Sequence, residues 1–558
     1  MKNNKKAAVE EDISGSVKPG KRKKQKREKN KNSNGMRLAK RWRRGFSSVI
    51  FSRFSLVLLL LIFQAFLMVV VMQLFELVIA GFILNTEMYF LLLELLQFTL
   101  LVAILNSNMN STAKLPWVLL IATVPYFGIL FYLWTKLEFG HRKVRNRLYT
   151  LYSEPSAKLK QNTSALEGIY KADEGSKGLA NYLYTISKSP VYENTSVKYY
   201  KLGEDKFNAM LEELEKAEKF IFIEYFIIAE GYMWGNILEI LAKKAAQGVD
   251  VRVMYDGTCE LSSLPYYYPK RMKKLGIKCK VWEPIKPVVT SSYNYRDHRK
   301  ILVIDGKVAF TGGVNLADEY INKETRFGHW KDTAILIKGA AVDSFTVMFL
   351  QMWNVKEKTT EDFSKYLGLY DRNTRAKGYI IPYGETPLNK HKAGERVYED
   401  ILYNAKDYVY IMSPYLVLDD DLTNAMRFAA ERGVDVRIIL PGIPDKKAVF
   451  ALAKSHYKNL MDAGVKIYEY TPGFVHAKVF VSDDKKAVVG TINLDYRSLY
   501  HHFECAAYMV DVPCISDILA DYRETLPKCK TITYDTLKHE KLKTKLTGKL
   551  MKLIAPML

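Results

Sequence analysis

The residues of this chain that are best suited to chemistry occur in two copies of one spaced pattern. The first copy is His298, Lys300, Asp305 and Asn315, and the second is His476, Lys478, Asp483 and Asn493. Both copies obey H-x-K-x4-D-x6-G-[GT]-x-N. A single H-x-K-x4-D would be weak evidence, because roughly one in a few tens of chains would contain it by chance at average residue usage. Two copies with the same downstream glycine and asparagine indicate one shared site.

These residue types suit a reaction at a phosphate group. Alternate side chains of a strand share a face, so the histidine and the lysine of each copy are expected to project together. Lysine and asparagine donate hydrogen bonds without adding negative charge, which suits phosphate oxygens. Two imidazoles on opposite sides of a phosphorus atom suit in-line displacement, in which one attacks and the other protonates the leaving oxygen. No carboxylate cluster suggests a divalent metal, so we expect no cofactor and positive charge supplied by lysine.

The elements that must position these residues also repeat along the chain. From about residue 195, short β-rich runs alternate with amphipathic helices. The sequence Gly-Val-Asp-Val-Arg occurs at 248–252 and again at 433–437, and a helix and a Gly-led strand follow each copy. The offset of about 180 residues indicates an internal duplication. The chain therefore predicts an α/β fold of two βαβ-rich halves, with two mostly parallel sheets packed face to face about a pseudo-two-fold axis.

The N-terminal region differs in composition and predicts membrane association. Residues 1–45 carry +13 of the net charge of +23, so the tail at 1–48 is expected to be disordered. Three apolar stretches follow, at 55–75, 88–106 and 115–134. Each is long enough to cross about 30 Å of hydrocarbon. The sequence therefore predicts transmembrane helices at 49–136, with two to three spans in a cell membrane.

Basic residues flank this apolar region on both sides, which favours the cytoplasm for both the tail and the body. That arrangement requires an even number of crossings from three apolar stretches. Three explanations stay open: one stretch is re-entrant, residues 56–84 form a hairpin, or the rule that basic flanks lie in the cytoplasm fails at one end. Glu94 costs about 2.5 to 3.5 kcal/mol at the centre of a span, so we expect 88–106 to be irregular or packed against its neighbours.

The remaining boundaries follow from composition and from the repeat. We expect a linker at 137–195, the first half at 196–375, the second half at 376–540 and an amphipathic C-terminal helix at 541–558. That last helix either lies on a membrane surface or packs on the body. The five cysteines have no metal-binding spacing and are expected to be free thiols. His501 and His502 beside Glu504 form a weak metal candidate, and we expect them to be rim or core polar residues.

The doubled motif resembles the signature motif of the phospholipase D superfamily. The second copy continues through Asn493-Leu494-Asp495-Tyr496-Arg497-Ser498 to Glu504, and the first half contains Trp330-Lys331-Asp332-Thr333. With a membrane region ahead of the body, these elements resemble bacterial cardiolipin synthases of the phospholipase D type from about residue 115 onward. His329 departs from the pattern, in which an aromatic residue such as Tyr precedes the tryptophan.

The resemblance implies a phosphatidyltransferase that makes cardiolipin and glycerol from two phosphatidylglycerol molecules. It implies that His298 is the nucleophile, forming a phosphatidyl-histidine, and that His476 is the general acid and then the base. It implies that an acid some thirty residues after each histidine orients the ring. These acids would be Asp332, 34 residues after His298, and Glu504, 28 after His476.

Other roles and functions stay open at this point. Asp305 and Asp483 belong to the candidate catalytic motif, but we expect them to hold the turn after each motif strand. The partners implied are phosphatidylglycerol and anionic membrane lipid, with no nucleic acid, and the oligomeric state is open. The alternative function is a phospholipase D-type hydrolase that releases the same intermediate to water. A non-catalytic membrane scaffold is disfavoured, because both motifs are intact.

Overall fold

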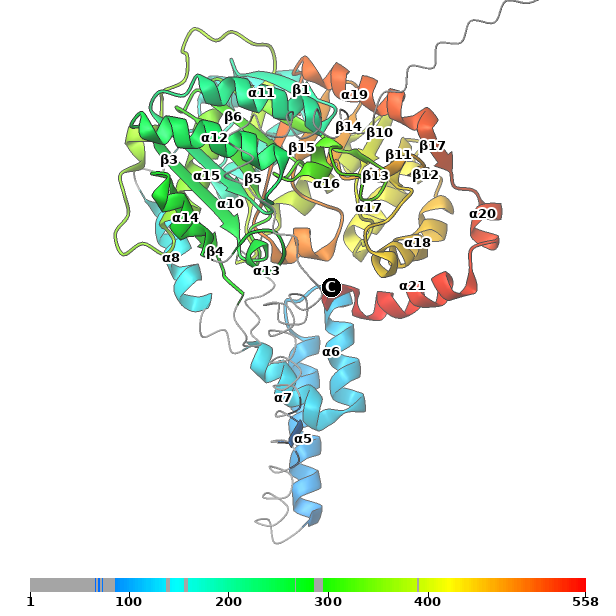
Figure 1. Cartoon of the computed structure of the whole chain (residues 1–558). Coiled ribbons are helices and arrows are strands. Elements are labelled where there is room, and N and C mark those ends of the chain that lie inside the picture. Colours follow the sequence, from blue (N-terminus) through cyan, green and yellow to red (C-terminus); the bar gives the residue numbers. More distant parts are fainter. Residues whose placement is uncertain are drawn as a thin grey trace, which may run out of the picture.

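The fold is that of a computed structural model, shown in Figure 1. It describes residues 86–136, 141–154, 159–265, 267–285, 295–388 and 391–557, together with 66, 69, 70 and 73. The basic tail at 1–48 lies outside the described residues, as does all of the first apolar stretch except those four positions.

A seven-stranded sheet forms the core of the first half, in the order β1-β8-β6-β5-β2-β3-β4. Its strands are β1 (Ser196–Tyr200), β2 (Phe220–Tyr225), β3 (Asp250–Asp256), β4 (Lys278–Trp282), β5 (Lys300–Ile304), β6 (Val308–Gly312) and β8 (Ala334–Lys338). The helices that accompany it are α11 (Gly203–Glu215), α12 (Tyr232–Ala246), α13 (Cys259–Ser262), α14 (Tyr268–Lys274) and α15 (Val342–Asn354).

An eight-stranded sheet forms the second half, in the order β17-β12-β11-β10-β14-β15-β16-β9. Its strands are β9 (Tyr379–Glu385), β10 (Tyr408–Met412), β11 (Asp435–Pro441), β12 (Lys466–Tyr470), β14 (Val479–Ser482), β15 (Lys486–Gly490), β16 (Glu504–Val510) and β17 (Cys529–Thr531). The main helices are α16 (Ala393–Asn404), α17 (Asp420–Glu431), α18 (Lys447–Met461) and α19 (Cys514–Thr525). Taken from β9, the strand order repeats that of the first sheet, with β17 added. The duplicated α/β halves are therefore confirmed.

The sheets are mixed rather than mostly parallel, which corrects the expectation. In the first sheet β2, β3 and β4 are parallel, whereas β5, β6, β8 and β1 pair antiparallel. Helical crossovers such as α12 return the chain to a parallel strand. In contrast, β5 and β6 are joined by a tight turn in which Asp305 and Gly306 have φ of +54° and +67°. Such a turn permits only an antiparallel partner.

The two halves share one interior. Buried side chains from both sheets and from α15 form a continuous core, including Phe222, Phe349, Val481 and Ala507. A two-stranded parallel ribbon also joins the halves, since β7 (His329–Lys331) of the first half pairs with β13 (Gly473–Val475) of the second. The ribbon strands lie directly before Asp332 in the first half and directly before His476 in the second, so their pairing brings these two residues together.

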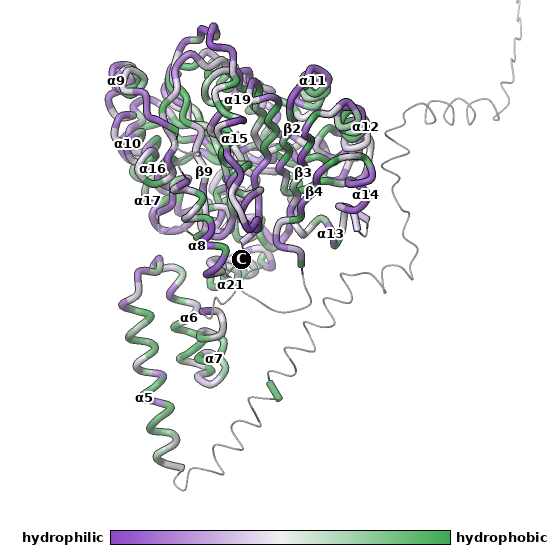
Figure 2. Tube along the Cα trace, turned by 90° about the vertical axis from the view of Figure 1, so that its left-hand side faces the viewer, coloured by the Kyte–Doolittle hydropathy of each residue, from purple (hydrophilic) through white to green (hydrophobic). Residues whose placement is uncertain are grey.

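The helices α5 (Thr86–Leu105), α6 (Ser111–Thr123) and α7 (Pro125–Lys136) project from one side of the body and are largely apolar (Figure 2). Their exposed side chains include Leu91, Leu95 and Phe98. Among the described residues, we find no helix with the length and apolar character needed to cross a membrane. The predicted transmembrane helices are therefore not confirmed by the fold.

The stretch whose helix is interrupted is 115–134, whereas 88–106 follows the second of its two expected alternatives and packs against its neighbours. Residues 88–105 lie in one continuous helix, α5, which packs its Ile104 with Ile121 and Ile129. In contrast, 115–134 divides between α6 and α7. Pro125 has no N–H and disfavours a helical conformation at Val124, whose φ of −134° and ψ of 72° end α6. Glu94 raises the cost of contact with lipid, but it does not interrupt a helix backbone.

Short helices complete the described chain. They are α8 (His141–Ser153), α9 (Thr163–Ala172), α10 (Ser176–Ser187), α20 (Tyr534–Lys538) and α21 (Leu542–Ile554). The last of these packs on the body and also exposes apolar side chains. A Cβ on Gly548 would lie 2.3 Å from the carbonyl oxygen of Ala451 in α18, while Leu542 and Leu550 are exposed. In Figure 1, α21 lies on the side of the body from which α6 projects.

Candidate active site

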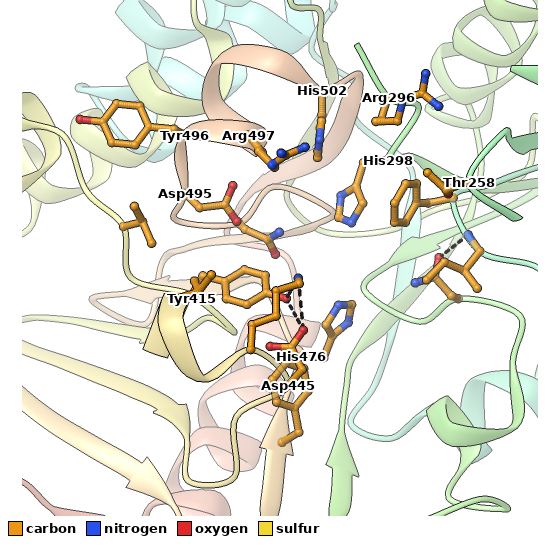
Figure 3. Close-up of a pocket in the computed structure, with 18 of the residues that line it drawn as sticks. Thr258, Arg296, His298, Tyr415, Asp445, His476, Asp495, Tyr496, Arg497 and His502 are labelled. Carbon is orange, nitrogen blue, oxygen red and sulfur yellow. Dashed lines mark hydrogen bonds and ion pairs between the residues drawn. The ribbon is translucent and has the colours of Figure 1, made fainter. Parts of the chain in front are cut away.

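Both motif histidines line one cavity between the halves. His298 lies directly before β5, and His476 lies just before β14. The cavity has a volume of about 660 Å³, and its lining includes both histidines, Asn315 and Asn493. Figure 3 shows the two imidazole rings directed into this space. The histidines and asparagines of the two motif copies thus meet at one cavity, as expected, but the two motif lysines are not among its lining residues.

Each histidine is held by a carboxylate from the other half. His298 Nδ1 lies 2.9 Å from both Oε1 and Oε2 of Glu504. His476 Nδ1 lies 2.7 Å from Oδ2 of Asp332. The expectation that each acid orients the histidine of its own half is therefore wrong, because the pairs are crossed.

The backbone explains the crossing. The N–H of His298 donates to the carbonyl oxygen of Phe503 at 2.9 Å, and the N–H of His476 donates to that of Lys331 at 2.7 Å. Phe503 and Lys331 directly precede the two orienting acids. Each acid-bearing segment therefore lies alongside the histidine of the opposite half, so neither half contains a complete site.

The carboxylates also set which ring nitrogen faces the cavity. A hydrogen bond from Nδ1–H to a carboxylate leaves Nε2 with its lone pair. Within the described chain, Nε2 of His298 and of His476 has no hydrogen-bond partner. Burial and nearby lysines lower the pKa of His298 well below its usual range, and burial lowers that of His476 to about 4. Both shifts favour the neutral imidazole, which is the form that a nucleophile requires.

The motif lysines lie beneath the cavity wall. Lys300 Nζ donates to the carbonyl oxygen of His298 at 2.7 Å, and Lys478 Nζ donates to that of His476. Burial lowers the pKa of Lys300 to about 8 and that of Lys478 to about 7. An ammonium has three donors, so each lysine keeps donors that these bonds do not use. A positive charge at these positions would act on an anion in the cavity through a region of low dielectric.

The two motif asparagines differ in how they are engaged. Oδ1 of Asn315 accepts the N–H of Ile227 at 3.1 Å, and its Nδ2 donates to the hydroxyl of Tyr320 at 2.8 Å. Oδ1 of Asn493 is buried and has no partner among the described residues. Asn315 therefore holds the wall in place, while Asn493 lines the cavity with that buried Oδ1.

The motif aspartates lie outside the cavity. Asp305 accepts the backbone N–H groups of residues 218–220 at 2.7–2.8 Å. Asp483 accepts those of residues 406–408 at 2.8–3.0 Å. Each carboxylate thus ties the turn after its motif strand to the chain entering the neighbouring strand, β2 or β10. This is a framework role and not a catalytic one.

One residue position that sequence reasoning missed distinguishes the two orienting acids. The hydroxyl of Thr491 donates to Oε2 of Glu504 at 2.5 Å. The equivalent position in the first half is Gly313, where a Cβ would lie 2.0 Å from Oδ1 of Asp332. The signal available in the sequence was the Gly in the first motif copy where the second has Thr. The Thr491 hydroxyl holds Glu504, whereas the absence of a side chain at Gly313 leaves room for Asp332.

Aromatic rings line the wall beside the histidines. The ring of Phe226 lies 4.8 Å from that of His298, and those of Tyr320 and Trp330 lie 5.4 Å and 5.5 Å from that of His476. The unusual His329 does not line the cavity and meets the hydroxyl of Tyr470 at 3.1 Å. The rings of Phe226, Tyr320 and Trp330 give the wall beside both motif histidines an apolar surface.

His502 lines the cavity, whereas the adjacent His501 meets the carbonyl oxygen of Pro556 at 3.5 Å. Ligand atoms of His298, His502 and Glu504 lie within 4.8 Å of one another. A metal there would have to displace the hydrogen bond between His298 and Glu504. The donor set therefore fits a hydrogen-bonded pair better than a metal site.

Comparisons with known proteins agree with this geometry. The family model described as the PLD-like domain of cardiolipin synthase matches residues 210–353 and 398–526. A cardiolipin synthase of Alkalihalophilus pseudofirmus is 32% identical over 82% of this chain and 91% of its own length. An uncharacterized protein of Streptococcus mutans is 55% identical over 82% of this chain and 98% of its own length.

A solved structure shares the fold. The crystal structure of phosphatidylserine synthase from Haemophilus influenzae aligns with a TM-score of 0.51 at 15% identity. The alignment covers 69% of this chain and 98% of that one.

Proposed function

Because the chain belongs to the cardiolipin synthase family of phospholipase D-like proteins, we propose that it is a membrane-bound phosphatidyltransferase. Its reaction converts two molecules of phosphatidylglycerol into cardiolipin and glycerol. The observation that carries this proposal is the pair of imidazoles that face one cavity, each held by a carboxylate from the opposite half. Such a pair suits the exchange of one phosphodiester for another, which consumes no nucleotide.

In the first step, Nε2 of His298 attacks the phosphorus of one phosphatidylglycerol. The bond from phosphorus to the glycerol oxygen breaks, and His476, which takes up a proton from solvent at Nε2 when the lipid binds, gives that proton to the oxygen. A bound phosphate raises the pKa of His476 from about 4, since an anion nearby favours the imidazolium. Asp332 stabilises the imidazolium from the other side. The products are glycerol and a phosphatidyl-histidine at His298.

In the second step, a hydroxyl of another phosphatidylglycerol attacks the phosphorus. His476, now neutral, takes the hydroxyl proton, and the bond from phosphorus to His298 breaks. Lys300 and Lys478 stabilise the negative charge on the phosphoryl oxygens in both steps. Water in place of the lipid hydroxyl would give phosphatidic acid, which is the product of the alternative hydrolase.

Two surfaces support attachment to a membrane on the same side of the body. Helices α5–α7 expose apolar side chains, and α21 exposes Leu542, Leu546, Leu550 and Leu553 between lysines. Apolar side chains interleaved with lysine suit an anionic lipid surface. The break between α6 and α7 supports the alternative in which this pair is the re-entrant stretch. The proposal keeps the tail and the body in the cytoplasm, which is the arrangement that the basic residues on both flanks favour.

Cysteine labelling tests this arrangement. Single cysteines at Ser14 and Ser364, in a chain without the five native cysteines, are treated with a membrane-impermeant maleimide in intact cells. We expect neither to be labelled until the membrane is opened. Labelling of Ser364→Cys but not of Ser14→Cys would contradict the cytoplasmic body.

Lipid analysis tests the reaction. The chain is expressed in cells that lack cardiolipin, and lipids are identified by mass spectrometry beside a His298→Ala variant. We expect cardiolipin with the wild-type chain and none with the variant. Accumulation of phosphatidic acid without cardiolipin would establish the hydrolase instead.

A further inference from the structure

A wide turn after the second motif places two further side chains on the cavity wall. Residues Arg497–His501 form one turn of π-helix, a geometry frequent at functional sites. Its closing hydrogen bond runs from the N–H of His502 to the carbonyl oxygen of Arg497 at 2.8 Å. The side chains of Arg497 and His502 line the cavity, and Figure 3 shows them next to each other on the same side of the cavity as His298.

His502 is buried without a partner. The residue is 7% exposed, and neither ring nitrogen has a hydrogen-bond partner in the described part of the chain. Its nearest carboxylate oxygen, Oε1 of Glu504, is 3.7 Å from Nδ1, which is beyond hydrogen-bonding distance. Buried polar groups are nearly always satisfied, so an unpaired imidazole that faces a cavity indicates a ligand.

Arg497 is also available. No described residue forms a hydrogen bond or ion pair with its side chain. Asp495 lies close enough to act electrostatically on Arg497, but its carboxylate accepts the N–H of Ser498 at 2.9 Å, and Asp445 accepts the hydroxyl of Tyr415 at 2.7 Å. Neither acid forms a hydrogen bond with Arg497, so its guanidinium donors stay open to an anion.

The proposed reaction requires two phosphates in one cavity, and only one of them reacts. The motif lysines serve the phosphorus bound to His298, while the acceptor lipid brings a second negative charge. The ring centroids of His298 and His502 are 5.5 Å apart, so a phosphate held at His502 and Arg497 would lie beside the one bound to His298. We propose that Arg497 and His502 form the subsite for the phosphodiester of the acceptor phospholipid, an inference that rests on the function proposed above.

Two activities of the same protein test this subsite. Exchange of radiolabelled glycerol into phosphatidylglycerol needs the donor lipid and a neutral acceptor, whereas cardiolipin formation needs an anionic acceptor. Both rates are measured in the same mixed micelles of phosphatidylglycerol, for the wild type, Arg497→Gln and His502→Asn. His501→Asn is the matched control, because His501 shares the turn but does not line the cavity.

We expect the ratio of cardiolipin formation to glycerol exchange to fall about tenfold to a hundredfold in Arg497→Gln, the effect of one charged hydrogen bond. His502→Asn should lower the ratio in the same direction, and His501→Asn should keep the wild-type ratio. An unchanged ratio in Arg497→Gln would overturn the subsite, whether both activities fall together or neither falls. Arg497 is exposed, so this variant decides the question even where His502→Asn folds poorly. A wild-type chain with neither activity would instead refute the proposed reaction.

Discussion

Replacing Glu504 by glutamine tests the crossed pairing of acids and histidines. In the wild type, Nδ1 of His298 lies 2.9 Å from both carboxylate oxygens, and Thr491 donates its hydroxyl to Oε2. In Glu504→Gln, the Thr491 hydroxyl still needs an acceptor, so the amide oxygen takes the place of Oε2. The amide NH₂ then points towards Nδ1 of His298. A donor at that place forces the ring proton onto Nε2, the atom that must attack.

The size of the effect follows from these contacts. A hydrogen bond to a charged group contributes about 1.5–3 kcal/mol, or about tenfold to a hundredfold in rate. Loss of the reactive tautomer adds to this cost, so we expect Glu504→Gln to slow attack by about a hundredfold or more. Asp332→Asn should slow turnover as well, because it misorients His476, but through the proton given to the leaving group.

A substrate with an activated leaving group separates the two effects. Phosphatidyl p-nitrophenol releases a weakly basic oxygen that needs little help from a general acid. We expect Asp332→Asn to release p-nitrophenol in the first turnover at nearly the wild-type rate, and Glu504→Gln to remain slow. Stopped-flow absorbance measures this burst. Glu524→Gln, an exposed glutamate paired with Lys201, is the control.

The reverse pattern would refute the assignment. Fast release by Glu504→Gln together with slow release by Asp332→Asn would mean that Glu504 does not act through the attacking histidine. Equal rescue of both variants would mean that neither acid acts on the nucleophile.

Three further outcomes follow from the same geometry. The value of kcat/KM should decline from about pH 7 to about pH 9, because deprotonation of Lys478 (pKa about 7) and Lys300 (pKa about 8) removes positive charge; a flat profile would contradict this. Asp305→Ala should lower the free energy of unfolding by about 3 kcal/mol in denaturant titration, since three backbone N–H groups lose their acceptor. Gly313→Ala should reduce cardiolipin formation at least about tenfold, because its Cβ would lie 2.0 Å from Oδ1 of Asp332; unchanged activity would show that Asp332 is dispensable.

The duplication was predictable because it is visible as repeated local sequence patterns. The repeated Gly-Val-Asp-Val-Arg strand and the doubled motif each recur at the same relative position, and strand order follows from that repeat. The mixed direction of the strands was less accessible, since a hydrophobic run has the same appearance in a parallel or an antiparallel pair. The tight turn at Asp305 and Gly306 was the local signal for the antiparallel partner.

The crossed pairs could not be inferred from spacing alone. Asp332 and Glu504 lie at similar distances along the chain from the histidines of their own halves, and the sequence contains no trace of the ribbon between β7 and β13. That pairing is a contact between halves and depends on how the two sheets dock. The same holds for Arg497 and His502, whose joint position depends on one wide turn.

The measurement that tests the central claim most directly is the identity of the residue that carries the lipid phosphate. The enzyme is mixed with phosphatidylglycerol labelled at phosphorus and denatured within milliseconds at alkaline pH, which preserves a phosphorus–nitrogen bond, and the labelled peptide is sequenced by mass spectrometry. We expect the label on His298, at reduced amount in Glu504→Gln and absent in His298→Ala. A label on His476, or none on any residue while cardiolipin forms, would contradict a transfer through His298 in a site shared by the two halves.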